Sequence, residues 1–214
     1  MAGRDYGQYC GVTRALELIG ERWALLIVRD LLVGPRRYGE LAAGLPRIPS
    51  NILSARLKEL QGAGIIRRAP RSRIIIYELT PYGRELEPVV LALSAWGFKA
   101  LDDPRDEQVL TADAMTIALR SAFRADAAAR LPATAYAARL GSVDLAVRVD
   151  GAALRIAPGA SDTADLAFSA GPGIRHLISG EITAGRAIET GEVRVLRGPP
   201  QLLGRFAQTF HLAA

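Results

Sequence analysis

The chain has 214 residues, 50% hydrophobic and 23% charged, with a formal net charge of +5 at pH 7. This length can bury two cores of about 100 residues each, and no stretch approaches the roughly 20 consecutive apolar residues of a membrane span. The N-terminus lacks the apolar segment of a signal peptide, so we expect a cytoplasmic protein that does not contact membranes. One cysteine and two separated histidines, His176 and His211, exclude an intrachain disulfide and argue against a metal site.

The charge is unevenly divided along the chain. Residues 1–101 hold 15 basic and 9 acidic side chains, a net +6, whereas residues 102–214 hold 12 and 13, a net −1. A basic half joined to a nearly neutral half indicates one domain that faces a polyanion and one with another task.

The first predicted elements are helices. The stretch "VTRALELIGERWALLIVRDLLVG", residues 12–34, has apolar residues at helical spacing and predicts one helix, or two broken near Gly20. "YGELAAGL" then predicts a short helix, and "PRIP" predicts a turn closed by two prolines.

The next helix has two contrasting faces, and we place Ser50 at its N-cap. At 100° per residue, three leucines share one face and are predicted to be buried: Leu53, Leu57 and Leu60. The opposite face carries small or polar side chains: Asn51, Ala55 and Lys58, flanked by Ser54. Short polar groups suit a surface that must approach a partner closely, whereas a solvated helix usually carries long charged side chains.

A basic hairpin follows this helix. "IIRRAP" and "RIIIYEL" read as two short β-strands joined by a tight loop around Arg71, Ser72 and Arg73. A helix pair followed by such a hairpin predicts a winged helix-turn-helix, in which the helix reads base edges in the major groove of double-stranded DNA. The alternative is a solvated basic surface on a small helical domain. The candidate DNA-binding residues are Arg36, Arg37, Ser50, Asn51, Ser54, Lys58, Arg71 and Arg73.

A long helix is predicted over "LTPYGRELEPVVLALSAWGFKAL". Thr80 is its N-cap, Pro81 occupies the first helical position, and Pro88 should bend it. Its apolar stripe needs either its own core or a partner chain: Leu86, Val89, Val90, Leu93 and Trp96. We expect a homodimer, because two recognition helices about 34 Å apart match successive major grooves of a pseudo-palindromic operator.

Residues 10–97 resemble the HxlR-type winged helix-turn-helix regulators of bacteria. The resemblance rests on a cysteine before the first helix, then "IGERWALLIVRDLL", "GPRRYGEL", "LSARLKELQGAGII" and "YELTPYG" in that order. It implies a dimeric transcription factor whose helix near Ser50 reads the operator. The wing loop looks shorter than is common in the family, so contacts by Arg71 and Arg73 are less secure.

Cys10 matches the position at which some members of that family sense oxidants or electrophiles. From the sequence, only Arg14 is close enough to lower its thiol pKa. A buried or half-buried structural cysteine is therefore the favoured interpretation, and redox sensing is the alternative.

The second half reads as an α+β domain with a mostly antiparallel sheet. We expect a domain at 1–101, a linker at 102–108 around "LDDPRDEQ", and a second domain at 109–214. "TADAMTIALRSAFRADAAARL" predicts one or two helices, and "ATAYAARL", "VDLAVRVDG" and "AALRIAPG" alternate like strands. Asp150 and Gly151 predict a hairpin turn. A strand at "ADLAFSA", a helix at "GPGIRHLISGEI", a strand at "ETGEVRVLRG" and a helix at "PPQLLGRFAQTF" complete the domain.

The run from "ADLAFSA" to "AQTF" is similar to the C-terminal half of sterol-carrier-protein-like domains. That resemblance implies a curved sheet beneath helices, often around an apolar cavity for lipid-like molecules. The candidate cavity residues are Phe168, Leu177, Ile178, Ile188, Val193, Val195, Leu203, Phe206 and Phe210. Apolar spacing cannot separate such a cavity from a filled core. Arg175 and His176 could meet a polar ligand head or form a solvated helix face.

These observations predict a DNA-binding transcriptional regulator whose second domain binds a small hydrophobic effector. Two alternatives stay open: a lipid-like carrier or interaction module tethered to DNA, or a regulator whose second domain is only a structural brace. Because the sequence has no nucleophile motif, no phosphate-binding glycine loop and no distinctive carboxylate pair, we expect neither enzymatic activity nor a cofactor.

Overall fold

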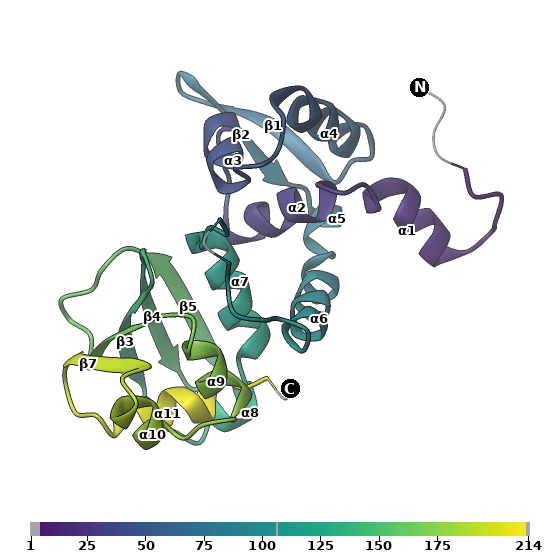
Figure 1. The fold of residues 1–214 in the computed structure, drawn as a ribbon. Helices are drawn as coiled ribbons and strands as arrows, with labels where there is room; N and C mark the ends of the chain where they lie inside the picture. Colours follow the sequence, from purple (N-terminus) through teal and green to yellow (C-terminus); the bar gives the residue numbers. More distant parts are fainter. Residues whose placement is uncertain (1–4, 106, 213–214) are drawn as a thin grey trace. The chain divides into compact units, whose positions relative to one another are not determined.

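The computed structural model describes residues 5–105 and 107–212 (Figure 1). The chain divides into two compact units, with the division between Val90 and Leu91. The division falls inside a helix, and the predicted domain limits at 101 and 109 stay a prediction. Within the described ranges, no helix combines the length and the apolarity that crossing a membrane requires.

The first unit consists of helices and one β-hairpin. Its elements are α1 (Gly11–Ile19), α2 (Ala24–Val33), α3 (Tyr38–Gly44), α4 (Ser50–Gly62), β1 (Ile66–Arg71), β2 (Ile74–Leu79), α5 (Pro81–Arg84) and the start of α6 (Glu87–Phe98). The prediction of two helices broken near Gly20 is confirmed, and the Gly20 N–H closes α1 by donating to Leu16 O at 2.8 Å.

The leucine stripe of α4 is buried as predicted. Leu53, Leu57 and Leu60 are 0%, 2% and 1% exposed, and burying each side chain contributes about 2 kcal/mol. The predicted N-cap was wrong by one residue, because Pro49 holds the extended cap conformation and Ser50 is the first helical residue. Pro49 has no side-chain hydrogen bond to give, so α4 begins without a side-chain cap.

The hairpin has the predicted tight turn. β1 and β2 are antiparallel with Arg71 opposite Ile74, which leaves only Ser72 and Arg73 in the turn. Ser72 takes a left-handed φ of 54°, as two-residue hairpin turns require. Arg36 extends the hairpin as an isolated bridge, since its backbone exchanges hydrogen bonds of 3.0 and 2.7 Å with Tyr77.

The expected long bent helix after the hairpin is two helices instead. Thr80 caps α5 as predicted, because its hydroxyl accepts the Gly83 N–H at 3.0 Å. The chain then makes a turn at residues 85 and 86 before α6 begins at Glu87. Pro88 lies in the first turn of α6, where its missing N–H costs nothing, so the proline starts a new helix rather than bending an existing one.

The second unit is an α+β structure around a five-stranded sheet. Besides the end of α6, its elements are α7 (Ala112–Ala122), α8 (Ala125–Ala128), β3 (Thr134–Leu140), β4 (Val143–Asp150), β5 (Ala153–Pro158), β6 (Leu166–Ala170), α9 (Ile174–Ser179), α10 (Ala184–Glu189), β7 (Val193–Arg197) and α11 (Leu202–Thr209). The strand order is β5-β4-β3-β6-β7, and only the β3–β6 pair is parallel. The mostly antiparallel sheet is therefore confirmed.

One face of this sheet carries the core. Residues alternate along β4 as expected, with buried Val143, Leu145, Val147 and Val149 between partly or fully exposed neighbours. Helices α7, α9 and α11 contribute side chains to the same core. The sequence interpretation missed α10, whose short segment is capped by the Thr183 hydroxyl and anchored by fully buried Ala187.

Candidate nucleic-acid interface

The solvent-facing side of α4 presents short polar groups and one cation. Asn51, Ser54 and Lys58 are exposed, while Ala55 is partly buried. Among the described residues, Asn51 and Lys58 have no side-chain partner, so both remain available to a ligand. The buried leucines fix this side outward, since rotating the helix would expose the core.

Ser54 has a partner that the sequence did not reveal. The hydroxyl oxygen of Tyr38, in the first turn of α3, lies 2.9 Å from Ser50 O and 3.3 Å from Ser54 Oγ. Tyr38 therefore ties α3 to the first turn of α4. No sequence pattern indicated this contact, because it depends on how the turn between the two helices folds.

The wing arginines differ in their surroundings. Glu78 on β2 lies opposite Arg67 on β1, and Arg67 Nε donates to Glu78 Oε1 at 2.7 Å. The other carboxylate oxygen of Glu78, Oε2, lies 3.3 Å from Arg71 Nη2. The hydrogen bond from Arg67, with added attraction from both arginines, lowers the pKa of Glu78 below its usual range. Arg73 at the turn is exposed and, in the described part of the chain, makes no ion pair. Of the two predicted wing contacts, Arg73 is free and Arg71 is restrained.

The sequence interpretation also overlooked two wing arginines. Arg67 and Arg68 are both exposed on β1, and Arg67 is held by Glu78 as described. Arg68 makes no ion pair with any residue that the structure describes. The signal was present as the "RR" dipeptide, but only the strand register shows which of the two is paired.

Arg36 and Arg37, which the sequence predicts as phosphate contacts, precede α3. Arg36 is anchored to β2 through its backbone, and its Nη1 donates to Pro35 O at 3.0 Å. Arg37 caps α3, and its backbone N–H donates to Glu40 Oε2 at 2.6 Å. These bonds fix the position of both backbones, whereas the Arg37 side chain remains exposed.

Cys10 is exposed and immediately precedes α1, so the prediction of a buried or half-buried cysteine was wrong. The backbone N–H groups of Thr13 and Val12, and then the Thr13 hydroxyl, lower the pKa of the thiol below its usual value, because they favour the thiolate. The expectation that only Arg14 could lower this pKa was wrong. The responsible groups are the free N–H groups at the start of a helix.

The candidate effector residues of the second unit pack together. Phe168, Phe206 and Phe210 are fully buried, with ring centroids 5.1 Å apart for Phe168–Phe206 and 4.6 Å for Phe206–Phe210. The other candidates belong to the same core or pack against it: Leu177, Ile178, Ile188, Val193, Val195 and Leu203. Their role in effector binding stays a prediction.

A cavity of about 340 Å³ lies on the other face of the sheet. Its lining includes Ala137 and Ala167, which pair across β3 and β6, together with Arg139 and Arg197. Of the nine candidate effector residues, only Phe168 contributes to its lining. The cavity and the predicted effector residues are thus largely separate.

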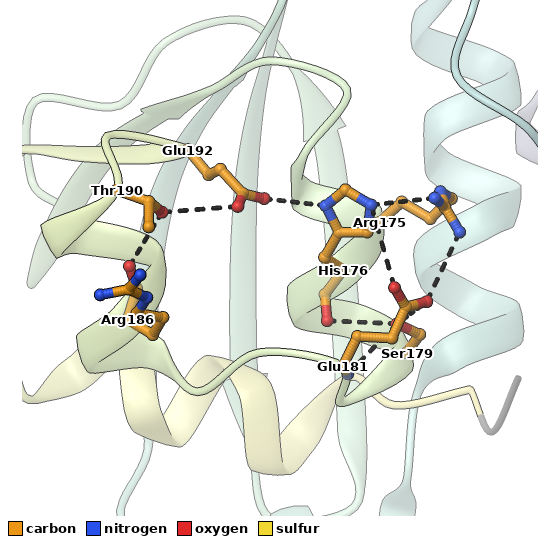
Figure 2. Close-up of polar contacts among 7 residues, drawn as sticks. All are labelled: Arg175, His176, Ser179, Glu181, Arg186, Thr190 and Glu192. Atoms are coloured by element: carbon orange, nitrogen blue, oxygen red, sulfur yellow. Dashed lines mark hydrogen bonds and ion pairs between the residues drawn. The ribbon is translucent and has the colours of Figure 1, made fainter.

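A polar cluster surrounds His176 on α9 (Figure 2). Its Nδ1 lies 2.9 Å from Glu192 Oε2, and its Nε2 lies 2.9 Å from Arg175 Nη2. Glu181 Oε1 lies 3.5 Å from Arg175 Nη1 and accepts a hydrogen bond from the Ser179 hydroxyl at 2.9 Å. Both ring nitrogens of His176 are therefore occupied, which leaves no free imidazole nitrogen for a ligand. Among the described side chains, no group of three or more His, Cys, Asp or Glu could hold a metal ion.

Residues 18–104 match the family described as HxlR-like helix-turn-helix. An uncharacterised HTH-type transcriptional regulator of Mycobacterium bovis, Mb3122, is 45% identical over 96 residues, which are 44% of this chain and 60% of that protein. The chain thus covers less than two thirds of this relative's length. A second uncharacterised HTH-type transcriptional regulator, YvaP of Bacillus subtilis, is 37% identical over 92 residues, which are 42% of this chain and 85% of YvaP.

Among solved structures, the redox regulator HypR in its oxidised form is 32% identical. The match covers 44% of this chain and all of that chain, with a TM-score of 0.41. The family match, over residues 18–104, includes α3, α4 and the basic hairpin, and the chain covers 85% of YvaP at 37% identity. The chain belongs to the HxlR-like helix-turn-helix family.

Proposed function

We propose that this protein is a DNA-binding transcriptional regulator whose α4 reads the major groove. The observation that carries the proposal is the outer side of α4, where Asn51, Ser54 and Lys58 are exposed above a fully buried leucine stripe. Short side chains allow the helix backbone to approach base edges, and Lys58 supplies a phosphate contact. The free cations of the wing, Arg68 and Arg73, add charge on the same unit.

The DNA-bound form of the proposal is a homodimer on a pseudo-palindromic operator. Helix α1 exposes Val12 and Leu16 at 69% and 49%, and α6 exposes Leu93 and Trp96 at 45% and 75%. Large apolar side chains on two helices favour coverage by a second copy of the chain. Dimerisation would also double the number of phosphate contacts on one operator.

Selection of bound DNA tests this function. Purified full-length protein is mixed with genomic fragments, and the retained fragments are sequenced. We expect a two-fold symmetric motif that Asn51→Ala loses at specific positions, whereas Lys58→Ala should bind all sequences uniformly more weakly, because amides read bases and a lysine contacts phosphate. A motif unchanged in both variants would remove α4 as the reading helix.

The finer part of the proposal is a small hydrophobic effector bound by the second unit. Two locations compete. The aromatic core around Phe206 would have to open to admit a molecule, whereas the cavity above Ala167 is already open. Thermal stabilisation of the full chain by fatty acids and aromatic acids, repeated with Ala167→Phe, separates them. Stabilisation that survives the filled cavity favours the core, and no stabilisation by any compound favours a structural brace.

Thiol sensing is a second candidate function, and a specific observation favours it. Cys10 is exposed and its thiol pKa is lowered by the start of α1, so its thiolate is available to electrophiles. Loss of DNA binding after treatment with an electrophile, absent in Cys10→Ser, is the expected result if this candidate holds. Equal responses of both proteins would exclude it.

A further inference from the structure

The contact between α3 and α4 determines where the Ser54 proton points. A tyrosine hydroxyl has one proton, and a backbone carbonyl can only accept. The Tyr38 hydroxyl therefore donates its proton to Ser50 O, 2.9 Å away. The 3.3 Å contact between Tyr38 and Ser54 is then made by the serine proton, with the tyrosine oxygen as acceptor.

We infer that Tyr38 is a specificity-determining residue that turns Ser54 into a hydrogen-bond acceptor toward DNA. With its only proton directed at Tyr38, the exposed Ser54 oxygen presents lone pairs alone to the groove. A serine normally pairs with either donors or acceptors on base edges. Here it pairs only with donors. This inference rests on the proposed reading of DNA by α4.

The consequence is a base preference at one position of each half-site. In the major groove, adenine N6 and cytosine N4 are donors, whereas guanine and thymine present acceptors at the corresponding positions. Ser54 therefore selects adenine or cytosine over guanine or thymine on the contacted strand. One hydrogen bond of this kind gives a preference of about three- to ten-fold.

Tyr38 acts on this preference without touching a base. Phenylalanine at position 38 keeps the partly buried aromatic ring but removes the acceptor for the Ser54 proton. The serine hydroxyl then rotates freely and accepts or donates as the base requires. The preference should flatten to nearly equal affinity for all four bases at that position, while the neighbouring positions read by Asn51 keep theirs.

The test is a bound-DNA selection from a duplex library randomised over the half-site. It compares the wild-type protein with Tyr38→Phe, Ser54→Ala, Asn51→Ala and the matched control Tyr82→Phe, which removes the hydroxyl of an exposed tyrosine on α5. The measured quantity is the ratio of bases at each position. A general loss of affinity or stability leaves that ratio unchanged, so a weakened fold does not obscure the result.

The expected result is an adenine-or-cytosine preference that disappears in Ser54→Ala, flattens about three- to ten-fold in Tyr38→Phe and persists in Tyr82→Phe. If Ser54→Ala removes the preference but Tyr38→Phe retains it, Ser54 contacts the base and the role inferred for Tyr38 is overturned. A guanine or thymine preference at that position would overturn the acceptor assignment. If Ser54→Ala and Asn51→Ala both keep the wild-type motif, the proposed reading by α4 fails, and this inference fails with it.

Discussion

The two arginines at the wing tip should respond differently to substitution. Arg71 shares Glu78 with Arg67, whereas Arg73 has no ion-pair partner among the described residues. The Glu78 side chain is only 10% exposed and its pKa is lowered, so it stays ionised at neutral pH and holds both arginines. We therefore expect Arg73 to contribute a full phosphate contact and Arg71 only part of one.

The magnitude follows from counterion release. Each phosphate contact changes the slope of log affinity against log salt by about 0.9, so a dimer that loses one contact per protomer changes by about 1.8. Between about 50 and 200 mM salt, that difference corresponds to roughly 12-fold in affinity. Arg73→Ala should reduce the slope by about 1.8, and Arg71→Ala should reduce it by clearly less. Glu78→Gln should steepen the slope, because it releases both Arg67 and Arg71.

The assay is fluorescence anisotropy of a labelled operator duplex, titrated with each variant over that salt range. Arg155→Ala, which removes an exposed arginine from β5 in the second unit, is the matched control and should leave the slope unchanged. Equal slope changes for Arg71→Ala and Arg73→Ala would refute the restraint by Glu78. Unchanged slopes in all wing variants would show that the wing does not contact DNA.

Three further predictions test other parts of the structure. Alkylation of Cys10 by iodoacetamide should reach half its maximal rate at a lower pH than a free cysteine, because its thiol pKa is lowered and the thiolate is the reacting form; the same midpoint as free cysteine would contradict the effect of the α1 N-terminus. Trp96→Ser should shift the protein from dimer to monomer in sedimentation, since Trp96 is 75% exposed and belongs to the proposed dimer face rather than to the core of its own chain. An unchanged dimer would place the interface elsewhere. Gly83→Ala should destabilise the fold by about 1–3 kcal/mol in urea unfolding, because its Cβ would lie 2.0 Å from Ile65 O. Gly62→Ala, whose Cβ would meet open space, should instead stabilise α4 by up to about 1 kcal/mol. Equal changes in unfolding free energy for the two substitutions would show that the close approach at Gly83 is relieved without cost.

Local patterns predicted most of the first unit. The leucines of α4 repeat at helical spacing and the hairpin strands are rich in β-branched residues, so each element could be identified from its own residues. The division of α5 from α6 could not, because the sequence shows a proline inside an apolar stripe but not whether the preceding turn unwinds. The N-cap of α4 was misplaced because Ser50 is the usual residue type for a cap, whereas the geometry assigns that role to Pro49.

Interactions between elements were beyond sequence reasoning. The pairing of Arg67 with Glu78 requires the strand register, and the Tyr38 contact requires the fold of the turn before α4. In the second unit, the alternation along β4 indicated a buried face, but periodicity could not show that the aromatic residues would fill it. Helix α10 was missed because just three of its residues, Ala184, Ala187 and Ile188, belong to the core or pack against it, too few apolar residues for a periodic signal.

The most direct test of the central claim is the selection of bound genomic DNA with the full-length wild-type protein beside Asn51→Ala. Reading of the operator by α4 predicts a two-fold symmetric motif with half-sites about one helical turn apart, which Asn51→Ala loses at specific positions. Enrichment without symmetry, or the same motif with both proteins, would contradict it.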